Sequence, residues 1–197
     1  MNRRAILVAM SVFAAAIIGA ILAVLSTDPF GGNHGGTASS RLGGPFALVN
    51  QDGAEVTDRT FLGAPFAIFF GFTHCPDICP TKLFEISEVL RAAGPKGQRL
   101  RALFVTVDPE RDTPEVMKSY LGSFDGRILG LSGSRQAIEA AMKAYRIYAR
   151  KVPLEGGDYT MDHTALVFLV GKDGSVLGTL NVEGPPEKAA AEWLEHL

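Results

Sequence analysis

Hydrophobic and polar positions follow three patterns along the chain, and each pattern predicts a different kind of structure. The stretch from Ala5 to Leu25 contains no charged residue, and at about 1.5 Å per residue a helix of this length crosses a bilayer core. Glycine and small polar residues then dominate residues 26–44, which predicts a flexible tether. From Pro45 onward, apolar runs of strand length alternate with helical periodicity, which predicts a folded domain over residues 45–197.

Within this domain the predicted strands and helices alternate along the chain. Residues 66–72 form an unbroken apolar run that is typical of a strand buried on both faces. The other predicted elements are a hairpin over residues 46–56, strands at 100–107, 127–131, 164–170 and 175–181, and helices beginning near Pro80 and Asp112 and covering 134–148 and 186–197. This order predicts an α/β fold in which helices flank a central mixed sheet.

Basic residues are distributed unevenly around the long apolar run. Arg3 and Arg4 precede it, and no lysine or arginine follows until Arg41. By the positive-inside rule this predicts that residues 1–4 lie in the cytoplasm, that residues 5–25 form one transmembrane anchor, and that the rest is exported. A cleaved signal peptide is the alternative, but the run is longer than a usual signal core and no small-residue cleavage pattern follows it.

The charge of the chain argues against one class of partner. The formal net charge is −2, with 19 basic and 21 acidic side chains. The sequence has no lysine- or arginine-rich stripe of the kind that tracks a phosphate backbone. We therefore expect no nucleic-acid partner.

The chain has only two cysteines, Cys75 and Cys79, and they lie four residues apart. A disulfide between them closes a very small loop and adds little stability through chain entropy, so a chemical role is favoured over a structural disulfide. The pair lies where the buried strand gives way to the helix near Pro80. The positive end of that helix favours thiolate over thiol, so the pair is suited either to disulfide exchange or to a metal.

His163 is the candidate third member of this site. It precedes the apolar strand at 164–170, and this strand is expected to lie near the strand that leads into Cys75. Two thiolates and one imidazole suit copper better than calcium or magnesium, whereas structural zinc usually takes four protein ligands. Taken alone, a histidine at this position is often a surface residue, and we expect Met161 to be core or surface and His74 to line the site.

Three stretches of the chain resemble the Sco/SenC family of copper-binding proteins. They are Gly71-Phe-Thr-His-Cys-Pro-Asp-Ile-Cys-Pro80, Val107-Asp-Pro-Glu-Arg-Asp-Thr-Pro114 and Tyr159-Thr-Met-Asp-His-Thr164. The resemblance implies a thioredoxin-like fold with an inserted β-hairpin and one copper ion, Cu(I) or Cu(II), held by Cys75, Cys79 and His163. From the residues alone, the stretch from Asp108 to Pro114 is a turn and a helix cap rather than a catalytic segment.

The resemblance also implies a copper metallochaperone that assists assembly of the binuclear copper centre of cytochrome c oxidase, with copper handling that depends on the redox state of the cysteines. The alternative is a thiol–disulfide oxidoreductase that reduces the copper-ligand cysteines of the oxidase subunit. Expected partners are that subunit, a copper donor and a thiol reductant. A thiol peroxidase is disfavoured because Phe72 replaces the threonine that precedes a peroxidatic cysteine by three residues.

The expected location follows from the anchor and the family together. The chain is predicted to be a single-pass protein of a bacterial inner membrane with its domain in the periplasm. The alternative is a mitochondrial inner membrane with the domain facing the intermembrane space.

Overall fold

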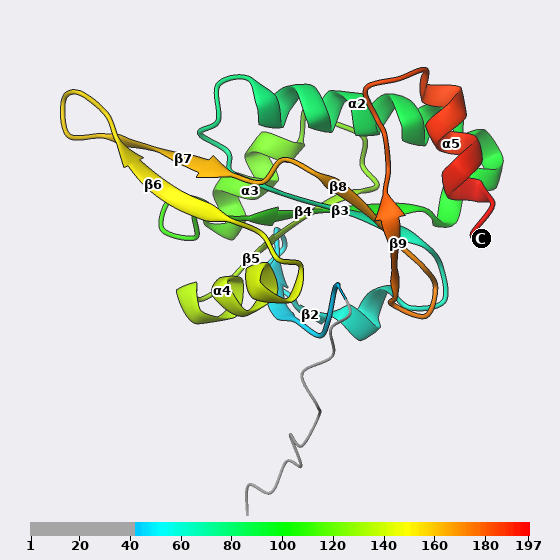
Figure 1. Cartoon of the computed structure of the whole chain (residues 1–197), viewed down its shortest axis with the longest axis horizontal. Coiled ribbons are helices and arrows are strands. Elements are labelled where there is room, and N and C mark those ends of the chain that lie inside the picture. The colour runs from blue at the N-terminus through cyan, green and yellow to red at the C-terminus, as the bar shows by residue number, and fades with distance from the viewer. Residues whose placement is uncertain (1–41) are drawn as a thin grey trace, which may run out of the picture. The chain divides into compact units, whose positions relative to one another are not determined.

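A seven-stranded mixed sheet forms the centre of the computed structural model, which describes residues 42–197. The strand order is β2-β1-β5-β4-β3-β8-β9 (Figure 1). The strands are β1 (Ala47–Asn50), β2 (Glu55–Thr57), β3 (Phe66–Gly71), β4 (Arg101–Thr106), β5 (Ile128–Ser132), β8 (Val167–Val170) and β9 (Val176–Thr179). The predicted anchor at residues 5–25 and the predicted tether up to residue 41 lie outside the described residues.

The central strands β3, β4 and β5 run parallel, and their neighbours on both sides run antiparallel. β3 pairs with β4 along its whole length, from Phe66 opposite Arg101 to Gly71 opposite Thr106. β8 pairs antiparallel with the other edge of β3, with Val167 opposite Phe69. The expectation that the strand after His163 lies beside the strand before Cys75 is therefore confirmed.

Helices cover both faces of the sheet, as predicted. They are α2 (Ile78–Ala92), α3 (Pro114–Leu121), α4 (Arg135–Ala144) and α5 (Pro186–Leu194), with short 3₁₀ helices at Asp58–Phe61 and Gly94–Arg99. α2 and α5 lie together on one face, and α4 lies on the other (Figure 1). All six residues of β3 are buried between these layers. The arrangement is the predicted thioredoxin-like α/β fold.

Several element boundaries differ from the sequence prediction, and the largest differences lie between α4 and β8. The predicted helix over 134–148 ends at Ala144, because Arg146 takes a positive φ of 54° that an α-helix does not allow. The chain then forms a separate antiparallel hairpin, β6 (Ala149–Pro153) and β7 (Tyr159–His163). His163 therefore ends β7, and the strand predicted to begin at residue 164 begins at Val167.

The C-terminal helix is fixed to the start of the central strand by one large side chain. Trp193 of α5 is fully buried, and its indole N–H donates to the carbonyl of Pro65 at 3.4 Å. None of the helices formed by residues 42–197 is long and apolar enough to span a bilayer.

Candidate metal centre

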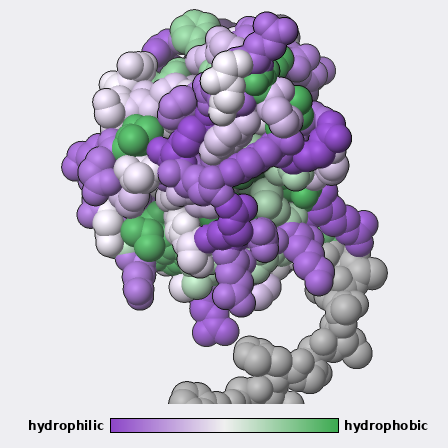
Figure 2. All heavy atoms as spheres, turned by 90° about the vertical axis from the view of Figure 1, so that its left-hand side faces the viewer, coloured by the Kyte–Doolittle hydropathy of each residue, from purple (hydrophilic) through white to green (hydrophobic). Residues whose placement is uncertain are grey.

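The loops that follow β3 and β4 meet at one edge of the sheet. Because these strands are parallel neighbours, the segment before α2 and the segment before α3 leave the sheet side by side. The β6–β7 hairpin lies at the same end of the molecule, at the left of Figure 1. Figure 2 looks onto this end, whose surface is largely hydrophilic with small hydrophobic patches between the polar side chains.

Cys79 is the buried sulfur of the pair. It lies in the first turn of α2 and has no exposed surface. Its Sγ is 3.7 Å from Nε2 of His163, a residue 84 positions away in sequence. Gly71 makes room for this sulfur, because a Cβ built there would lie 2.8 Å from Sγ and 2.6 Å from the Phe104 ring. Only glycine leaves both groups in place at this position.

Burial keeps the Cys79 sulfur protonated in the metal-free protein. Desolvation raises the pKa of its thiol far above the ordinary range, and the nearby Cys75 raises it further, although a backbone hydrogen bond from Phe72 acts in the opposite direction. The expectation that the helix N-terminus favours thiolate at this position is therefore wrong for Cys79, because desolvation outweighs the helix dipole. The distance of 3.7 Å between Cys79 Sγ and His163 Nε2 fits a thiol S–H that donates a hydrogen bond to Nε2.

Cys75 is the accessible sulfur. It is half-buried, and its Sγ accepts a hydrogen bond at 3.3 Å from the backbone N–H of Cys79. Both cysteines are free thiols. A ligand that approaches from solvent therefore meets Cys75 before it meets Cys79.

His163 is held so that one nitrogen faces the sulfur. Nδ1 lies 3.0 Å from the carbonyl oxygen of Thr164, a distance at which Nδ1 carries the hydrogen and donates. The ring packs edge-on against Phe72, with centroids 5.6 Å apart. Nε2 then carries the lone pair and points toward Cys79. In metal-binding histidines the nitrogen that does not bind the metal usually donates a hydrogen bond in this way, as Nδ1 does here.

The spacing of these donors fits a bound metal ion. Metal–sulfur bonds of about 2.3 Å and metal–imidazole bonds of about 2.0 Å, as in zinc sites, separate the two donor atoms by about 3.5–3.7 Å at trigonal to tetrahedral angles. Cys79 Sγ and His163 Nε2 already lie 3.7 Å apart. Over residues 42–197, however, no three His, Cys, Asp or Glu side chains form a ready-made metal cluster, so the Cys75 sulfur has to turn from the Cys79 N–H to complete a three-donor set.

Met161 packs partly buried against the hydrophobic core, as predicted. It lies two residues before His163 in β7, so the two side chains share one face of the strand. Met161 lines a cavity of about 130 Å³ together with Met142 of α4. It is therefore partly buried on the face that His163 also uses.

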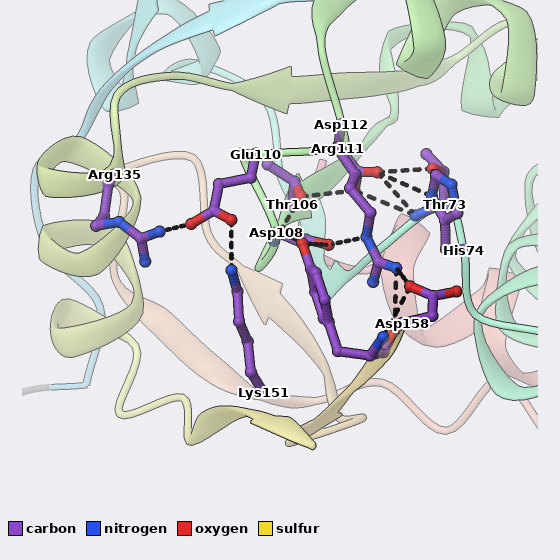
Figure 3. Close-up of polar contacts among 11 residues, drawn as sticks. Thr73, His74, Thr106, Asp108, Glu110, Arg111, Asp112, Arg135, Lys151 and Asp158 are labelled. Atoms are coloured by element: carbon purple, nitrogen blue, oxygen red, sulfur yellow. Dashed lines mark hydrogen bonds and ion pairs between the residues drawn. The ribbon is translucent and has the colours of Figure 1, made fainter. Parts of the chain in front are cut away.

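The sequence reasoning missed Asp112, whose buried carboxylate fixes the segment before Cys75. The carboxylate accepts hydrogen bonds of 2.6 Å from the Thr73 hydroxyl and 2.6 Å from the Thr106 hydroxyl, and also from the backbone N–H of Thr73 (Figure 3). Burial raises its pKa more than these hydrogen bonds lower it. Thr113 is the N-cap of α3, as predicted, but the carboxylate next to it faces the cysteine loop.

His74 lies near the same carboxylate, and none of its hydrogen bonds reaches a cysteine sulfur. Its Nδ1 lies 3.1 Å from the Thr73 hydroxyl and 4.0 Å from Asp112, and its side chain is half exposed. It therefore lies on the outer side of the loop, and its expected place in the lining of the site stays a prediction.

A second cluster of polar side chains connects the β6–β7 hairpin to the segment before α3. Arg111 donates to the carbonyl of Tyr159 at 2.9 Å and to the buried carboxylate of Asp108 at 2.5 Å, and its guanidinium lies 3.7 Å from the centre of the Tyr159 ring. The Tyr159 hydroxyl donates to Asp108 at 2.9 Å. In Figure 3, Glu110 also forms ion pairs with Arg135 of α4 and Lys151 of β6. These contacts hold the strand that carries His163.

Comparison with known proteins places this geometry in a family. The SCO1/SenC family model matches residues 34–197. The chain belongs to the SCO1/SenC family. A solved structure of Bradyrhizobium japonicum ScoI with copper bound is 54% identical to it, with a TM-score of 0.77, over 79% of this chain and 99% of that one.

Two further family members extend the comparison. The mitochondrial SCO1 homolog of Mus musculus is 42% identical over 147 residues, which cover 73% of this chain and 52% of the mouse protein. This chain therefore matches about half the length of that relative. A solved structure of BsSco is 28% identical to this chain, with a TM-score of 0.63 over 81% of this chain and 95% of that one. BsSco is described as a member of the Sco family of cytochrome c oxidase assembly proteins.

Proposed function

We propose that this chain binds one copper ion through Cys75 Sγ, Cys79 Sγ and His163 Nε2 and assists assembly of the binuclear copper centre of cytochrome c oxidase. The observation that carries the proposal is the 3.7 Å separation between Cys79 Sγ and His163 Nε2. These donors come from different elements, and their separation is that of two ligands on one metal ion.

The chemistry of the donors selects the metal. Thiolate sulfur is a soft ligand that favours Cu(I), and imidazole binds copper in either oxidation state. Three donors leave a coordination position open, which suits an ion that has to be passed on by ligand exchange. The copper-bound structure of the Bradyrhizobium relative supports the same cargo.

The site residues have distinct tasks in this proposal. Cys75 makes first contact, since it is the accessible sulfur. Cys79 gives up its proton, and the metal ion takes the place of that proton between Sγ and Nε2. His163 keeps its orientation because Thr164 holds Nδ1.

Oxidation of the cysteine pair opposes this binding. When an oxidant takes two electrons and the two thiol protons, the sulfurs form a disulfide and neither is available as a thiolate ligand. The same reduced pair is the basis of the second candidate function, in which it gives two electrons and two protons to a disulfide in the oxidase subunit. The half-buried position of Cys75 favours this candidate, because disulfide exchange needs one reachable sulfur.

The proposed location follows from the predicted anchor. Residues 5–25 hold the chain in a bacterial inner membrane, and the copper-binding domain faces the periplasm. The mitochondrial relatives make the inner mitochondrial membrane the alternative. The copper donor and the thiol reductant act on the same side as the domain.

Titration of the reduced chain with Cu(I), in the presence of a competing chelator, tests the proposal. We expect one equivalent to bind wild type, and His163→Ala to weaken binding by at least roughly a hundredfold, because loss of a residue that only supports a metal ligand already costs about 10- to 100-fold. His196→Ala, in the last residues of the chain, is the matched control and should bind as wild type does. The oxidised chain should bind none.

Two results would contradict the copper function. One is equal affinity in wild type and His163→Ala, and the other is tight Cu(I) binding by the disulfide form. If His163→Ala also reduces a disulfide of the oxidase subunit as fast as wild type does, the reductase candidate is favoured.

A further inference from the structure

Basic side chains gather on one part of the domain, although the domain as a whole is acidic. Residues 135–151 carry five basic side chains and one acidic side chain, whereas the rest of residues 42–197 carries 11 basic and 19 acidic ones. The five belong to α4, the turn after it and β6, and we call them the basic face: Arg135, Lys143, Arg146, Arg150 and Lys151. All five are exposed. Such a separation of charge attracts anionic surfaces to one side of the molecule.

The side chains of the basic face come together from two elements. Arg135 and Lys143 lie eight residues apart in α4, so they share one side of the helix. Arg135 also lines a cavity of about 130 Å³ together with Arg150 and Lys151 of β6. The face is therefore continuous from α4 to the β6–β7 hairpin.

Three carboxylates offset part of this charge. Glu110 forms ion pairs with Arg135 and Lys151 (Figure 3), and Asp162 lies 3.8 Å from the Arg150 guanidinium. The third carboxylate is the acidic residue of α4, at position 139. Five basic side chains against three carboxylates leave the face positive.

The chain enters the domain at the basic face. The backbone N–H of Gly43 donates to the carbonyl of Ala144 at 2.9 Å, and Ala144 is the last residue of α4. Lys143 and Arg146 lie on either side of that residue in sequence. Residues 26–41 separate the predicted anchor from the described domain, and 16 residues span at most about 55 Å. A membrane that holds the anchor is therefore never farther than this from the point of entry.

We propose that the basic face binds the anionic phospholipid headgroups of the membrane that holds the chain. The inference rests on the proposed location, in which residues 5–25 are a membrane anchor. Each lysine or arginine near an anionic membrane adds a modest attraction. A short tether makes such a weak attraction effective, because it keeps the lipid surface at a high effective concentration. The anchor therefore favours lipid over a freely diffusing acidic protein as the occupant of this face.

Binding through the basic face orients the domain. α2 and α5 cover the face of the sheet opposite to α4 (Figure 1), so both helices are directed away from the bilayer. Lys188 of α5 is exposed and remains in solution. The chain therefore has lysines both on the basic face, at Lys143 and Lys151, and on the side that faces away from the lipid.

Acetylation of the full-length chain in vesicles, with an uncharged ester as reagent and peptide mass spectrometry as readout, tests the inference. On vesicles that contain phosphatidylglycerol, Lys143 and Lys151 should react about fivefold more slowly relative to Lys188 than on vesicles of phosphatidylcholine alone. This factor is the effect of about one basic residue held at an anionic surface. Potassium chloride at about 0.5 M should remove the difference, because it screens exposed charges.

A charge-neutralised variant shows whether the basic face itself is responsible. Lys143→Gln/Arg146→Gln removes two charges beside the point of entry and keeps Lys151 as the reporter, whose slowing should fall below about twofold. Arg91→Gln/Lys96→Gln is the matched control, since it removes two exposed charges at the end of α2 and just after it, and it should retain the full difference. The salt series on wild type covers the case in which the variant does not fold.

The possible results separate the inference from the anchor and from the copper function. Equal reactivity on the two kinds of vesicle, in chains that float with the vesicles, overturns the inference and leaves the anchor intact. Chains that do not float with the vesicles overturn the anchor and the inference together. Slower acetylation that appears only when the oxidase subunit is added assigns the face to an acidic protein and overturns binding to lipid. Copper titration tests the copper function independently of all three results.

Discussion

Burial of the Cys79 sulfur determines the proton balance of the proposed copper binding. Desolvation raises the pKa of this thiol far above neutrality, so the metal-free protein carries the proton at every pH from 6 to 8. Copper binds the thiolate, so each binding event has to release that proton. Affinity for Cu(I) should therefore rise with pH, by at least about tenfold per pH unit for one released proton.

Calorimetric titration at pH 7 in two buffers that differ in ionisation enthalpy counts the released protons. We expect at least one proton per copper ion for wild type. Cys79→Ser should release at least one proton fewer, since serine has no thiol proton to lose. Binding without any proton release would contradict the protonated state of Cys79.

The candidate ligands could be predicted from the sequence, whereas the residues that hold them in place could not. Cys75 and Cys79 are the only cysteines, and sulfur chemistry at a strand-to-helix junction limits the choices to a disulfide or a soft metal. Asp112 was missed because its contact joins residues 39 positions apart and depends on the parallel pairing of β3 with β4.

At the scale of elements, the β6–β7 hairpin determines where His163 can be. The hairpin is a two-stranded sheet apart from the main one, and isolated hairpins are marginally stable in water. The contacts of Tyr159 with Arg111 and Asp108 hold its β7 strand against the segment before α3. The position of the imidazole therefore depends on these contacts as well as on the strand pairing.

Tyr159→Phe should loosen the hairpin without unfolding the domain. Loss of one hydroxyl hydrogen bond costs about 1 kcal/mol, so amide hydrogens of β6 and β7 should exchange about fivefold faster. Copper affinity should fall by a similar factor, because His163 is less often in place. Tyr148→Phe, an exposed tyrosine beside the hairpin, is the control and should leave both quantities unchanged. Unaltered hairpin exchange in Tyr159→Phe would show that these contacts do not hold the strand.

Periodicity predicted the elements of the main sheet well and the hairpin poorly. The apolar run at 66–72 and the buried strand β3 agree almost residue for residue, because burial on both faces gives an unbroken hydrophobic signal. Residues 145–163 have no such signal, since most of the side chains of β6 and β7 are exposed or half-buried. The hairpin was expected only from the resemblance to the family, and its bounds came from the structure.

At the scale of the whole molecule, the site is assembled from three distant parts of the chain. The cysteine loop follows β3, the supporting carboxylate of Asp112 follows β4, and His163 ends β7 before the chain enters β8. The pairing of β3 with both β4 and β8 brings these segments to one edge of the sheet. The fold therefore brings Cys79 Sγ and His163 Nε2 to within 3.7 Å of each other and leaves Cys75 accessible on the outer side.

X-ray absorption at the copper edge, measured on the reduced full-length chain loaded with one equivalent of Cu(I), tests this assembly most directly. The account predicts two sulfur neighbours and one nitrogen neighbour, at distances near the zinc values of about 2.3 Å and 2.0 Å, with the nitrogen lost in His163→Ala. A spectrum with two sulfurs and no nitrogen in wild type, or one that His163→Ala leaves unaltered, would contradict it.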